Sequence, residues 1–466
     1  MATKRILVVS NESGMGLGGV PVFNKLLTEG LAENKDHQVD LLYVTDDPQD
    51  HGAATVHTIP PVPGEDKIQT LLNASQRDPR DFGLPAKGEK TYDIIVGHSR
   101  FSGPAASAMR SAWYPDAMHL NFLHTAPEKL ERAKITNLSD EAMVAMREEA
   151  GRRKLEVEMK LLGTASVGVG VGELLAEEVR RIQALTAQAR SWHDLMPGGE
   201  GVVTFSPPSP KDQFNVLLMG RMDDPMKGGG DALAAVKYLN DKGRNVHLTI
   251  RGASEETLGA KQAEADALAG GAGRVTVKPF TKRKQDLVDD MHGNHVVIMP
   301  SKTEGFGLVA TEAASHCIPI LVNRDSGMAK FLQDPDRGAA HLGKDSVVMT
   351  PEDVSQRHIA WADAIGNVAD NWADRKVGAY ELHNVLKHYT WENAGTALVE
   401  AGTKAKEGNV LGSKQIMDGG VKFFTADVAG LASPHASTGQ PESHQPSSAP
   451  VQGSPRLAAK PPTPTL

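Results

Sequence analysis

The chain has 466 residues, which is more than one hydrophobic core usually organises, so we expect two domains of ordinary size. Hydrophobic residues make up 40% of the chain and charged residues 23%, a composition that excludes wholesale disorder. The formal net charge of −8 gives no electrostatic reason to expect nucleic acid as the main partner.

The N-terminus indicates where the protein works. The first ten residues, MATKRILVVS, lack the longer apolar core of a secretory signal, and no stretch approaches the length of a membrane-spanning helix. The single cysteine, Cys317, excludes intrachain disulfides and a cysteine-rich zinc site and fits a reducing compartment. We therefore expect a cytoplasmic protein without an integral membrane segment.

The first part of the chain alternates short apolar strands with helices. Strands are expected at 6–9, 39–44, 92–96 and 119–123. A glycine-rich turn at 14–19 and an amphipathic helix at 22–32 connect the first two, which makes a βαβ unit. Parallel strands need such a crossover, and this alternation predicts a sheet that is buried on both faces.

The segment 214–250 repeats this plan. It reads as a strand at 216–219, a turn rich in glycine and charge, a helix at 231–239 and a strand at 246–250. Later strands are expected at 275–277, 295–299 and 318–322. The two series predict two separate doubly wound, Rossmann-like α/β domains.

Composition also suggests where the domains begin and end. We expect one domain at 1–200 and a second at 201–387, with a bridge at 196–211 where proline, glycine and serine cluster and where a cleft should open. The segment 432–466 is too poor in apolar residues to fold on its own, so we expect a disordered tail.

The stretch PSKTEGFGLVATEAASHCIPILV at 300–322 carries the strongest chemical signal. A strand ends in a glycine-flanked loop that holds Glu304, and a helix that starts near Gly307 holds Glu312. Gly305 and Gly307 let the backbone approach a ligand, and amides at a helix start can hold anionic or hydroxyl oxygens. Two carboxylates at this separation can grip hydroxyls on two different sugars.

A second motif, GRMDDPMKGGGDALAAV, follows the first strand of the second series. It places Gly220, Arg221, Lys227 and Gly228 on one strand–turn–helix unit. A pyrophosphate leaving group needs cations and a helix N-terminus to hold the charge that is released when a glycosidic bond breaks. Arg221 and Lys227 are therefore candidates for that role.

These two motifs resemble those of retaining glycosyltransferases of family 4, which have the two-domain GT-B fold. EGFGLVATE resembles the family's Glu-x7-Glu motif, and the second stretch resembles its Gly-Arg-(x5)-Lys-Gly signature. The resemblance implies metal-independent transfer of a sugar from a nucleotide-diphosphate sugar, with UDP-sugar as the prior expectation, to an unidentified acceptor, and no other cofactor. It covers roughly 5–405 and is loose over 50–200, where the acceptor should bind.

The resemblance also implies roles for particular residues. Three catalytic roles are implied. Glu304 would contact the transferred sugar, and Arg221 and Lys227 would contact the pyrophosphate. His124, which ends a strand in LNFLHTAP, would lie beside the donor sugar. Donor binding falls on the glycine loops and the two motifs: Gly18, Gly19, Gly220, Arg221, Lys227, Glu304, Gly305, Phe306, Gly307, Leu308 and Glu312. No residue is expected to bind a metal.

Two further segments carry weaker signals. His98, in IIVGHSRF, is a second candidate for the strand-end histidine, and the adjacent Arg100 is expected to be solvated, with contact to an anionic acceptor as the alternative. HYTWENAGTALVEAGTKA resembles the family's closing helix, so 388–415 is expected to cross back to the first domain, with Trp391 in a structural role.

Two departures from the family pattern leave other functions open. Cys317 stands where many members have glycine, and Lys330, beside Ser326 and Gly327, stands where relatives often carry glutamate. A donor-binding module without turnover is therefore one alternative, and a nucleotide-sugar epimerase or phosphorylase is another. GMGLGG at 14–19 also satisfies Gly-x-Gly-x-x-Gly, so a nicotinamide-dependent oxidoreductase is the third.

Overall fold

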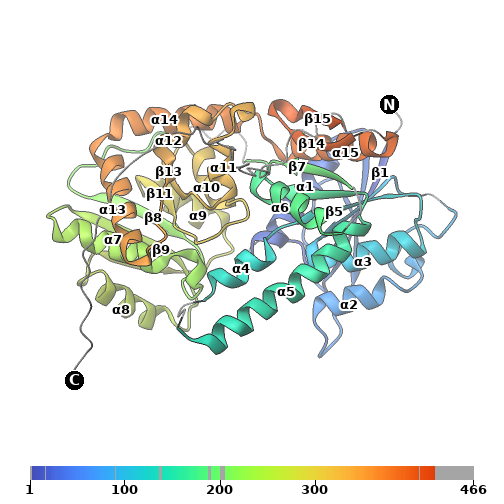
Figure 1. Ribbon diagram of the computed structural model, residues 1–466, viewed down its shortest axis with the longest axis horizontal. Coiled ribbons are helices and arrows are strands. Elements are labelled where there is room, and N and C mark those ends of the chain that lie inside the picture. The colour runs from blue at the N-terminus through green and yellow to red at the C-terminus, as the bar shows by residue number, and fades with distance from the viewer. Residues whose placement is uncertain are drawn as a thin grey trace, which may run out of the picture. The chain divides into compact units, whose positions relative to one another are not determined.

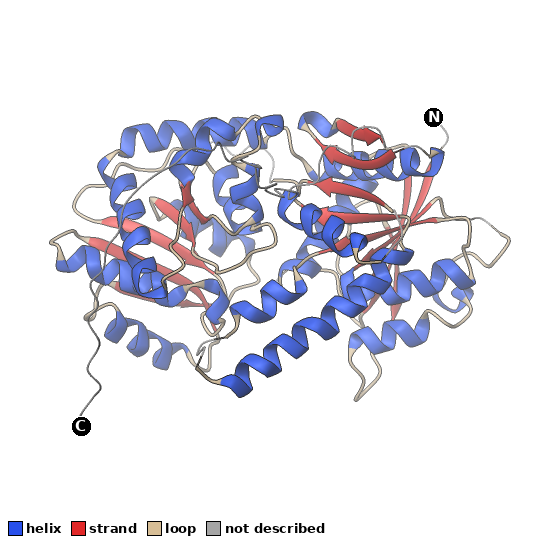
Figure 2. Ribbon diagram, in the orientation of Figure 1, coloured by secondary structure: helices blue, strands red, loops and turns tan. Residues whose placement is uncertain are grey.

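The computed structural model describes residues 3–15, 17–89, 91–135, 139–186, 190–199, 205–408 and 410–425. Strands in this part of the chain form two sheets, and helices lie on both sides of each (Figure 1, Figure 2). The tail expected at 432–466 and residues 200–204 of the expected bridge lie outside the described residues.

The first sheet has nine strands within the described residues, in the order β15-β14-β7-β6-β5-β4-β1-β2-β3. Neighbouring strands are parallel, except that β14 and β15 are antiparallel. The strands are β1 (Lys4–Ser10), β2 (His37–Val44), β3 (Thr55–Ile59), β4 (Ile94–His98), β5 (Met118–Leu123), β6 (Val167–Val171), β7 (Ser191–Leu195), β14 (Val410–Gln415) and β15 (Val421–Thr425). The associated helices are α1 (Gly19–Glu33), α2 (Lys67–Ala74), η1 (Pro79–Phe82), α3 (Ser99–Ala112), α4 (Pro127–Ala133), α5 (Glu141–Thr164), α6 (Glu173–Ala184) and α15 (Trp391–Glu407).

β1 shows why this sheet is covered on both faces. Ile6 and Val8 belong to one hydrophobic core cluster, whereas Leu7 and Val9 belong to another, and all four side chains are fully buried. Successive side chains of a strand point to opposite faces, so an uninterrupted apolar strand needs helices on both sides.

The second sheet has six strands in the described chain, in the order β10-β9-β8-β11-β12-β13, and all of its neighbours are parallel. The strands are β8 (Phe214–Met219), β9 (Val246–Ala253), β10 (Val275–Pro279), β11 (Val296–Met299), β12 (Ile320–Asn323) and β13 (Val347–Val348). The helices are η2 (Pro225–Lys227), α7 (Gly229–Asp241), α8 (Leu258–Leu268), α9 (Lys284–His292), α10 (Leu308–Ser315), α11 (Gly327–Phe331), η3 (Pro335–Arg337), η4 (Ala340–Leu342), α12 (Gly343–Ser346), α13 (Val354–Asp370) and α14 (Trp372–Leu386).

The C-terminal helix α15 packs on α1. The ring of Trp391 lies edge-on to Phe23, with 5.2 Å between the ring centroids. An ideal Cβ on Gly30 would lie 2.3 Å from the carbonyl carbon of Trp391, so only glycine allows the helices to come this close. The expectation of a helix over 388–415 is too long, because α15 ends at Glu407 and residues 410–415 form β14 of the first sheet.

The strand limits agree with the expected ones to within a few residues, with a clear shift at β4. This strand runs over Ile94–His98 rather than 92–96, because its pairing with β1 and β5 begins at Ile94. Tyr92 precedes the strand and donates its hydroxyl to Asp40 at 2.7 Å. In the described residues no helix has both the length and the apolar character needed to cross a bilayer.

Candidate active site

Lys227 and Glu304 meet at the carboxyl edge of the second sheet. β8 and β11 are parallel neighbours, so the turns after them lie side by side. The Lys227 ammonium donates to Oε2 of Glu304 at 2.6 Å, and the Ser301 hydroxyl donates to the same oxygen at 3.2 Å. The two charged side chains are 30% and 23% exposed, which leaves the ion pair accessible to a ligand. The structure thus brings together two of the predicted catalytic residues.

The backbone fixes the position of this carboxylate. The Glu304 N–H donates to the Asp325 carbonyl at 3.2 Å, and its own carbonyl accepts from the Gly327 N–H at 3.3 Å. These bonds tie the loop after β11 to the loop after β12. The carboxylate is therefore held by secondary structure on two neighbouring strands rather than by one mobile loop.

Two glycines in this region are required by close approach. Gly228 has a φ of 71°, and an ideal Cβ on it would lie 2.1 Å from the carbonyl oxygen of Pro300. Gly307 has a φ of 105° at the start of α10, where a Cβ would lie 2.5 Å from Cε of Met299. A side chain at either position would separate the turns that carry Lys227 and Glu304.

Arg221 is placed differently from Lys227. It follows Gly220 in the turn after β8 and pairs with Asp224 through an Nη2–Oδ2 distance of 2.9 Å. Its side chain is 78% exposed. Arg221 is therefore near the predicted site along the chain, and only its Nη2 is engaged by Asp224.

The remaining motif residues surround the start of α10. Phe306 is buried, whereas Gly305, Leu308 and Glu312 are half-buried. Glu312 lies in the second turn of the helix, next to the buried Thr311. Its predicted contact with a ribose stays a prediction.

His124 follows β5 in the first sheet and contacts His98, the last residue of β4. His124 Nε2 lies 3.0 Å from His98 Nδ1. His98 is fully buried, and burial lowers its pKa to about 3. Burial, together with the nearby His98 and Arg100, also holds the pKa of the half-buried His124 well below its ordinary value, so both rings are neutral at neutral pH.

Arg100 is not the solvated side chain that we expected. Its guanidinium lies over the Phe101 ring, 4.5 Å from the centroid, and its Nη1 is 3.8 Å from Oε1 of Glu158. The Arg100 N–H donates to the same carboxylate oxygen at 3.2 Å. Burial raises the pKa of Glu158 to about 7, against the opposing effect of Arg100.

The loop that carries Glu304 touches the first sheet. An ideal Cβ on Gly305 would lie 2.6 Å from the His124 carbonyl oxygen, and one on Gly172, before α6, would lie 2.6 Å from the Phe306 ring. Lys330 of α11 also donates to Glu177 of α6 at 3.2 Å. The predicted donor loop and the predicted strand-end histidine are therefore neighbours in the folded chain.

Gly18 and Gly19 stand at the beginning of α1. Gly18 has a φ of 106°, and an ideal Cβ on either glycine would have no neighbouring heavy atom within 4 Å. The loop before them is held by the Ser13 hydroxyl, 2.8 Å from His51 Nε2. Both glycines thus face open space, and their contact with donor phosphates stays a prediction.

The two departures from the family pattern have visible structural consequences. Cys317 is buried and has a φ of 56°, in the left-handed region where glycine is the favoured residue. Lys330 pairs with Glu177 of α6, so its charge is used in a contact between segments of the two sheets.

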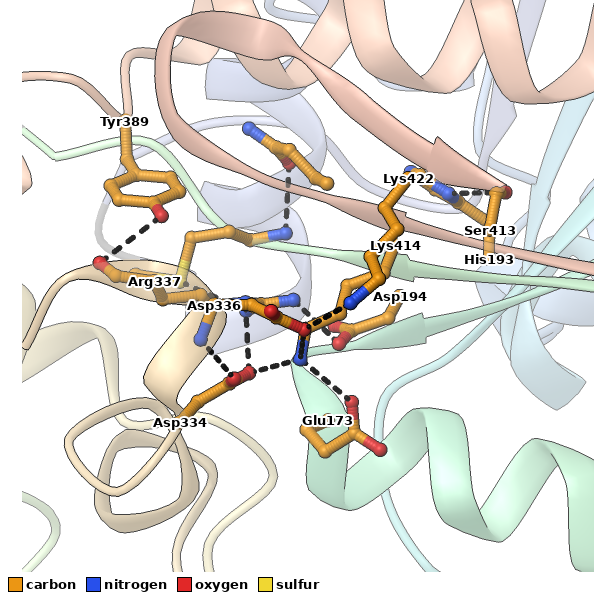
Figure 3. A network of polar contacts seen from close by, with 12 residues as sticks. Glu173, His193, Asp194, Asp334, Asp336, Arg337, Tyr389, Ser413, Lys414 and Lys422 are labelled. Atoms are coloured by element: carbon orange, nitrogen blue, oxygen red, sulfur yellow. Dashed lines mark hydrogen bonds and ion pairs between the residues drawn. The ribbon is translucent and has the colours of Figure 1, made fainter. Parts of the chain in front are cut away.

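A buried polar cluster was missed at the sequence level. Arg337 and Asp194 are both fully buried, with 2.5 Å between Nη2 and Oδ2. Lys414 of β14 pairs with Asp334 and lies 4.0 Å from Glu173. Figure 3 shows these side chains, from two strands of the first sheet, from α6 and from the η3 segment, pointing toward one another. Burial raises the pKa of Asp194 to about 7, against the effect of Arg337.

Two cavities lie away from these residues. One of about 280 Å³ lies between β12 and the helices α13 and α14, and one of about 540 Å³ lies at the amino ends of β1, β2 and β3. Neither is lined by a residue of the predicted site.

Comparison with known proteins gives a match over most of the chain. A family model described as "Family 4 Glycosyltransferase in conflict systems" matches residues 7–398. A D-inositol 3-phosphate glycosyltransferase from Xylanimonas cellulosilytica is 25% identical over 339 residues, which cover 68% of this chain and 73% of the relative. A protein of the same name from Corynebacterium urealyticum is 26% identical over 323 residues, covering 66% and 71%.

Solved structures share the fold. Sucrose-phosphate synthase from Thermosynechococcus elongatus has a TM-score of 0.62 at 19% identity and covers 87% of this chain and 99% of its own. Anabaena HepE, solved in complex with UDP and glucose, has a TM-score of 0.58 at 14% identity and covers 85% and 99%. The predicted fold, two parallel-sheet α/β domains of the GT-B type, is thereby confirmed.

Proposed function

The chain belongs to the family 4 glycosyltransferases, and from this premise we propose that it transfers a sugar from a UDP-sugar to a phosphorylated polyol with retention of anomeric configuration. The ion pair between Lys227 and Glu304 carries the proposal, because it sets a cation for a diphosphate beside a carboxylate for sugar hydroxyls. The names of the curated relatives suggest D-inositol 3-phosphate as the first acceptor to test.

In this proposal the second sheet binds the donor. Lys227, Arg221 and the amino end of α7, which begins at Gly229, hold the diphosphate, where positive charge stabilises the leaving group as the glycosidic bond breaks. Glu304 accepts hydrogen bonds from hydroxyls of the transferred sugar, and Glu312 does the same for the ribose. No metal is needed for these contacts.

The first sheet completes the reaction centre. His124 lies against Gly305 and faces the sugar. The acceptor hydroxyl attacks the anomeric carbon from the face from which the diphosphate departs, through an oxocarbenium-like state, and its proton passes to the departing diphosphate oxygen. The contacts of Gly305 with His124 and of Phe306 with Gly172 exclude water, which competes with the acceptor as nucleophile.

The decisive experiment measures UDP release and the glycosylated product from UDP-glucose and UDP-N-acetylglucosamine, each with and without D-inositol 3-phosphate. Lys227→Ala should lower kcat by roughly 100- to 1,000-fold, because it removes one donor to the charge that develops on the leaving group. Lys237→Ala is the matched control, since Lys237 pairs with Asp241 on the outside of α7 and the same charge is lost.

The outcomes separate the alternatives. Sugar isomerisation without a glycosylated product indicates an epimerase. A rise in melting temperature with UDP-sugar but no turnover indicates a binding module, and binding of NAD instead of UDP-sugar indicates an oxidoreductase. Equal activity of Lys227→Ala and Lys237→Ala would refute the assigned donor site.

A further inference from the structure

The pair of histidines at the edge of the first sheet has a geometry that the proposed function does not yet explain. β4 and β5 are parallel neighbours, with His98 in register with Phe122. Both strands therefore deliver an imidazole to the same edge, and the two rings meet through His98 Nδ1 and His124 Nε2 at 3.0 Å. Phe23 and Phe122 pack against both rings, so neither histidine is free to rotate.

The turn after β4 is held in an unusual conformation. Ser99 is buried and has a φ of 44°, a strained conformation for a non-glycine residue that persists only when its surroundings determine it. The Ser99 hydroxyl donates to the Phe122 carbonyl at 3.0 Å and accepts from the His124 N–H at 3.2 Å. One side chain therefore fixes the backbone of both strands beside the two rings.

A second hydroxyl holds His98 itself. The His98 N–H donates to the Ser102 hydroxyl at 3.0 Å, and that hydroxyl donates to the Val9 carbonyl at 2.7 Å. The end of β4 is thus tied to β1 on one side and to β5 on the other. These hydrogen bonds fix the backbone of His98 at the end of β4.

The hydrogen bond between two neutral imidazoles needs one proton, and the surroundings decide which ring supplies it. His98 Nε2 is buried and has no hydrogen-bond partner among the described residues. A proton on that nitrogen would make an unpaired buried N–H, which is rarer in proteins than an unpaired acceptor. The proton of His98 therefore sits on Nδ1 and is donated to Nε2 of His124.

The structure assigns His98 as a positioning residue: it holds His124 as the Nδ1–H tautomer, so that this ring offers an N–H donor to the bound sugar. The assignment rests on the proposed function. Because Nε2 of His124 accepts from His98, the proton of the neutral His124 ring must lie on Nδ1. No hydrogen bond within the described chain uses that nitrogen, so it is available to a ligand hydroxyl.

The first test reads the tautomer directly, without substrate. In protein labelled with ¹⁵N histidine, two-bond ¹H–¹⁵N correlation spectra at pH 7 should show a protonated Nδ1 and an unprotonated Nε2 for His124. His98→Leu should shift the ring toward the Nε2–H form. His98→Asn, whose side-chain amide occupies the position of Nδ1, should restore the Nδ1–H form.

The second test measures the consequence for catalysis. We expect kcat to fall at least tenfold in His98→Leu and to recover in part in His98→Asn, while the melting-temperature shift with UDP stays unchanged. His119→Leu is the matched control, because it removes another buried imidazole from β5 that has no histidine partner. If His98→Leu proves unstable, His98→Asn and the wild-type spectrum still decide the tautomer.

The possible results are distinct. An Nε2–H tautomer of His124 in the wild type overturns the assignment, as does an equal loss of kcat in His98→Leu, His98→Asn and His119→Leu. A wild type without transferase activity overturns the proposed function and, with it, the contribution of His98 to catalysis through His124. In that case the spectra still establish or refute the orientation of His124.

Discussion

Replacing Glu158 by glutamine should change how the stability of the protein depends on pH. Glu158 lies fully buried on α5; Oε1 accepts the Arg100 N–H at 3.2 Å, and Oε2 is buried with no partner in the described chain. Burial raises the pKa of this carboxyl from 4.5 to about 7. Between these values the folded state binds more protons than the unfolded state, so stability falls as pH rises.

The size of the effect follows from the two pKa values. One pKa unit corresponds to about 1.4 kcal/mol, so ionisation of Glu158 should remove about 3 kcal/mol of stability between pH 4.5 and 7.5. Glu158→Gln keeps an acceptor for the Arg100 N–H but cannot ionise. The free energy of unfolding of the variant, relative to that of the wild type, should therefore rise by about this amount between pH 4.5 and 7.5.

Urea unfolding at pH 4.5, 6 and 7.5 measures the difference, because each free energy comes from the same extrapolation. Glu156→Gln is the control for the loss of a carboxylate, since Glu156 is exposed two residues earlier on α5. If the free energy of unfolding changed with pH in the same way in the wild type and in Glu158→Gln, the raised pKa of Glu158 would be refuted. Arg100 would then keep the carboxylate ionised.

Two further predictions concern contacts between segments of the two sheets. Arg337→Met should lower the free energy of unfolding by about 3–5 kcal/mol, because it leaves the Asp194 carboxyl buried without its cation. Urea unfolding of the double variant Arg337→Met, Asp194→Leu should show part of this loss restored. A double variant as unstable as Arg337→Met alone would contradict the prediction. Gly305→Ala should lower kcat at least tenfold while the melting-temperature shift with UDP persists, because the new Cβ would lie 2.6 Å from the His124 carbonyl oxygen. Gly259→Ala, in open space on α8, is its control, and unchanged kinetics of Gly305→Ala would show that the contact is not needed.

Much of the fold could be predicted because its first strands are short apolar runs followed by glycine-rich turns. β1 and β8 are of this kind. β7 has the sequence SWHDL, and its buried His193 and Asp194 look like loop residues until their partners on β14 and η3 are known. The hairpin of β14 and β15 was missed for a similar reason, because its strands are recognised only once β14 is seen to pair with β7 at the edge of the first sheet.

The candidate site was predictable where one strand–turn–helix unit carries a whole motif. Lys227 and Glu304 are 77 residues apart, yet each follows a strand whose position the alternation of strands and helices had indicated. The Arg337 cluster and the role of His98 depend instead on which strands are neighbours. Neither the charge of Arg337 nor the single histidine in IIVGHSRF contains that information.

The ion pair between Lys227 and Glu304 has a consequence for the order of events on the proposed enzyme. An arriving diphosphate competes with the Glu304 carboxylate for the Lys227 ammonium, so donor binding exchanges one ionic partner of Lys227 for another. The affinity gained is therefore smaller than an unpaired Lys227 would give. The carboxylate that is released can then turn to the sugar. UDP alone lacks the transferred sugar and so offers Glu304 none of that sugar's hydroxyls in exchange. On the proposed mechanism UDP should therefore bind more weakly than the UDP-sugar, which favours turnover over product inhibition.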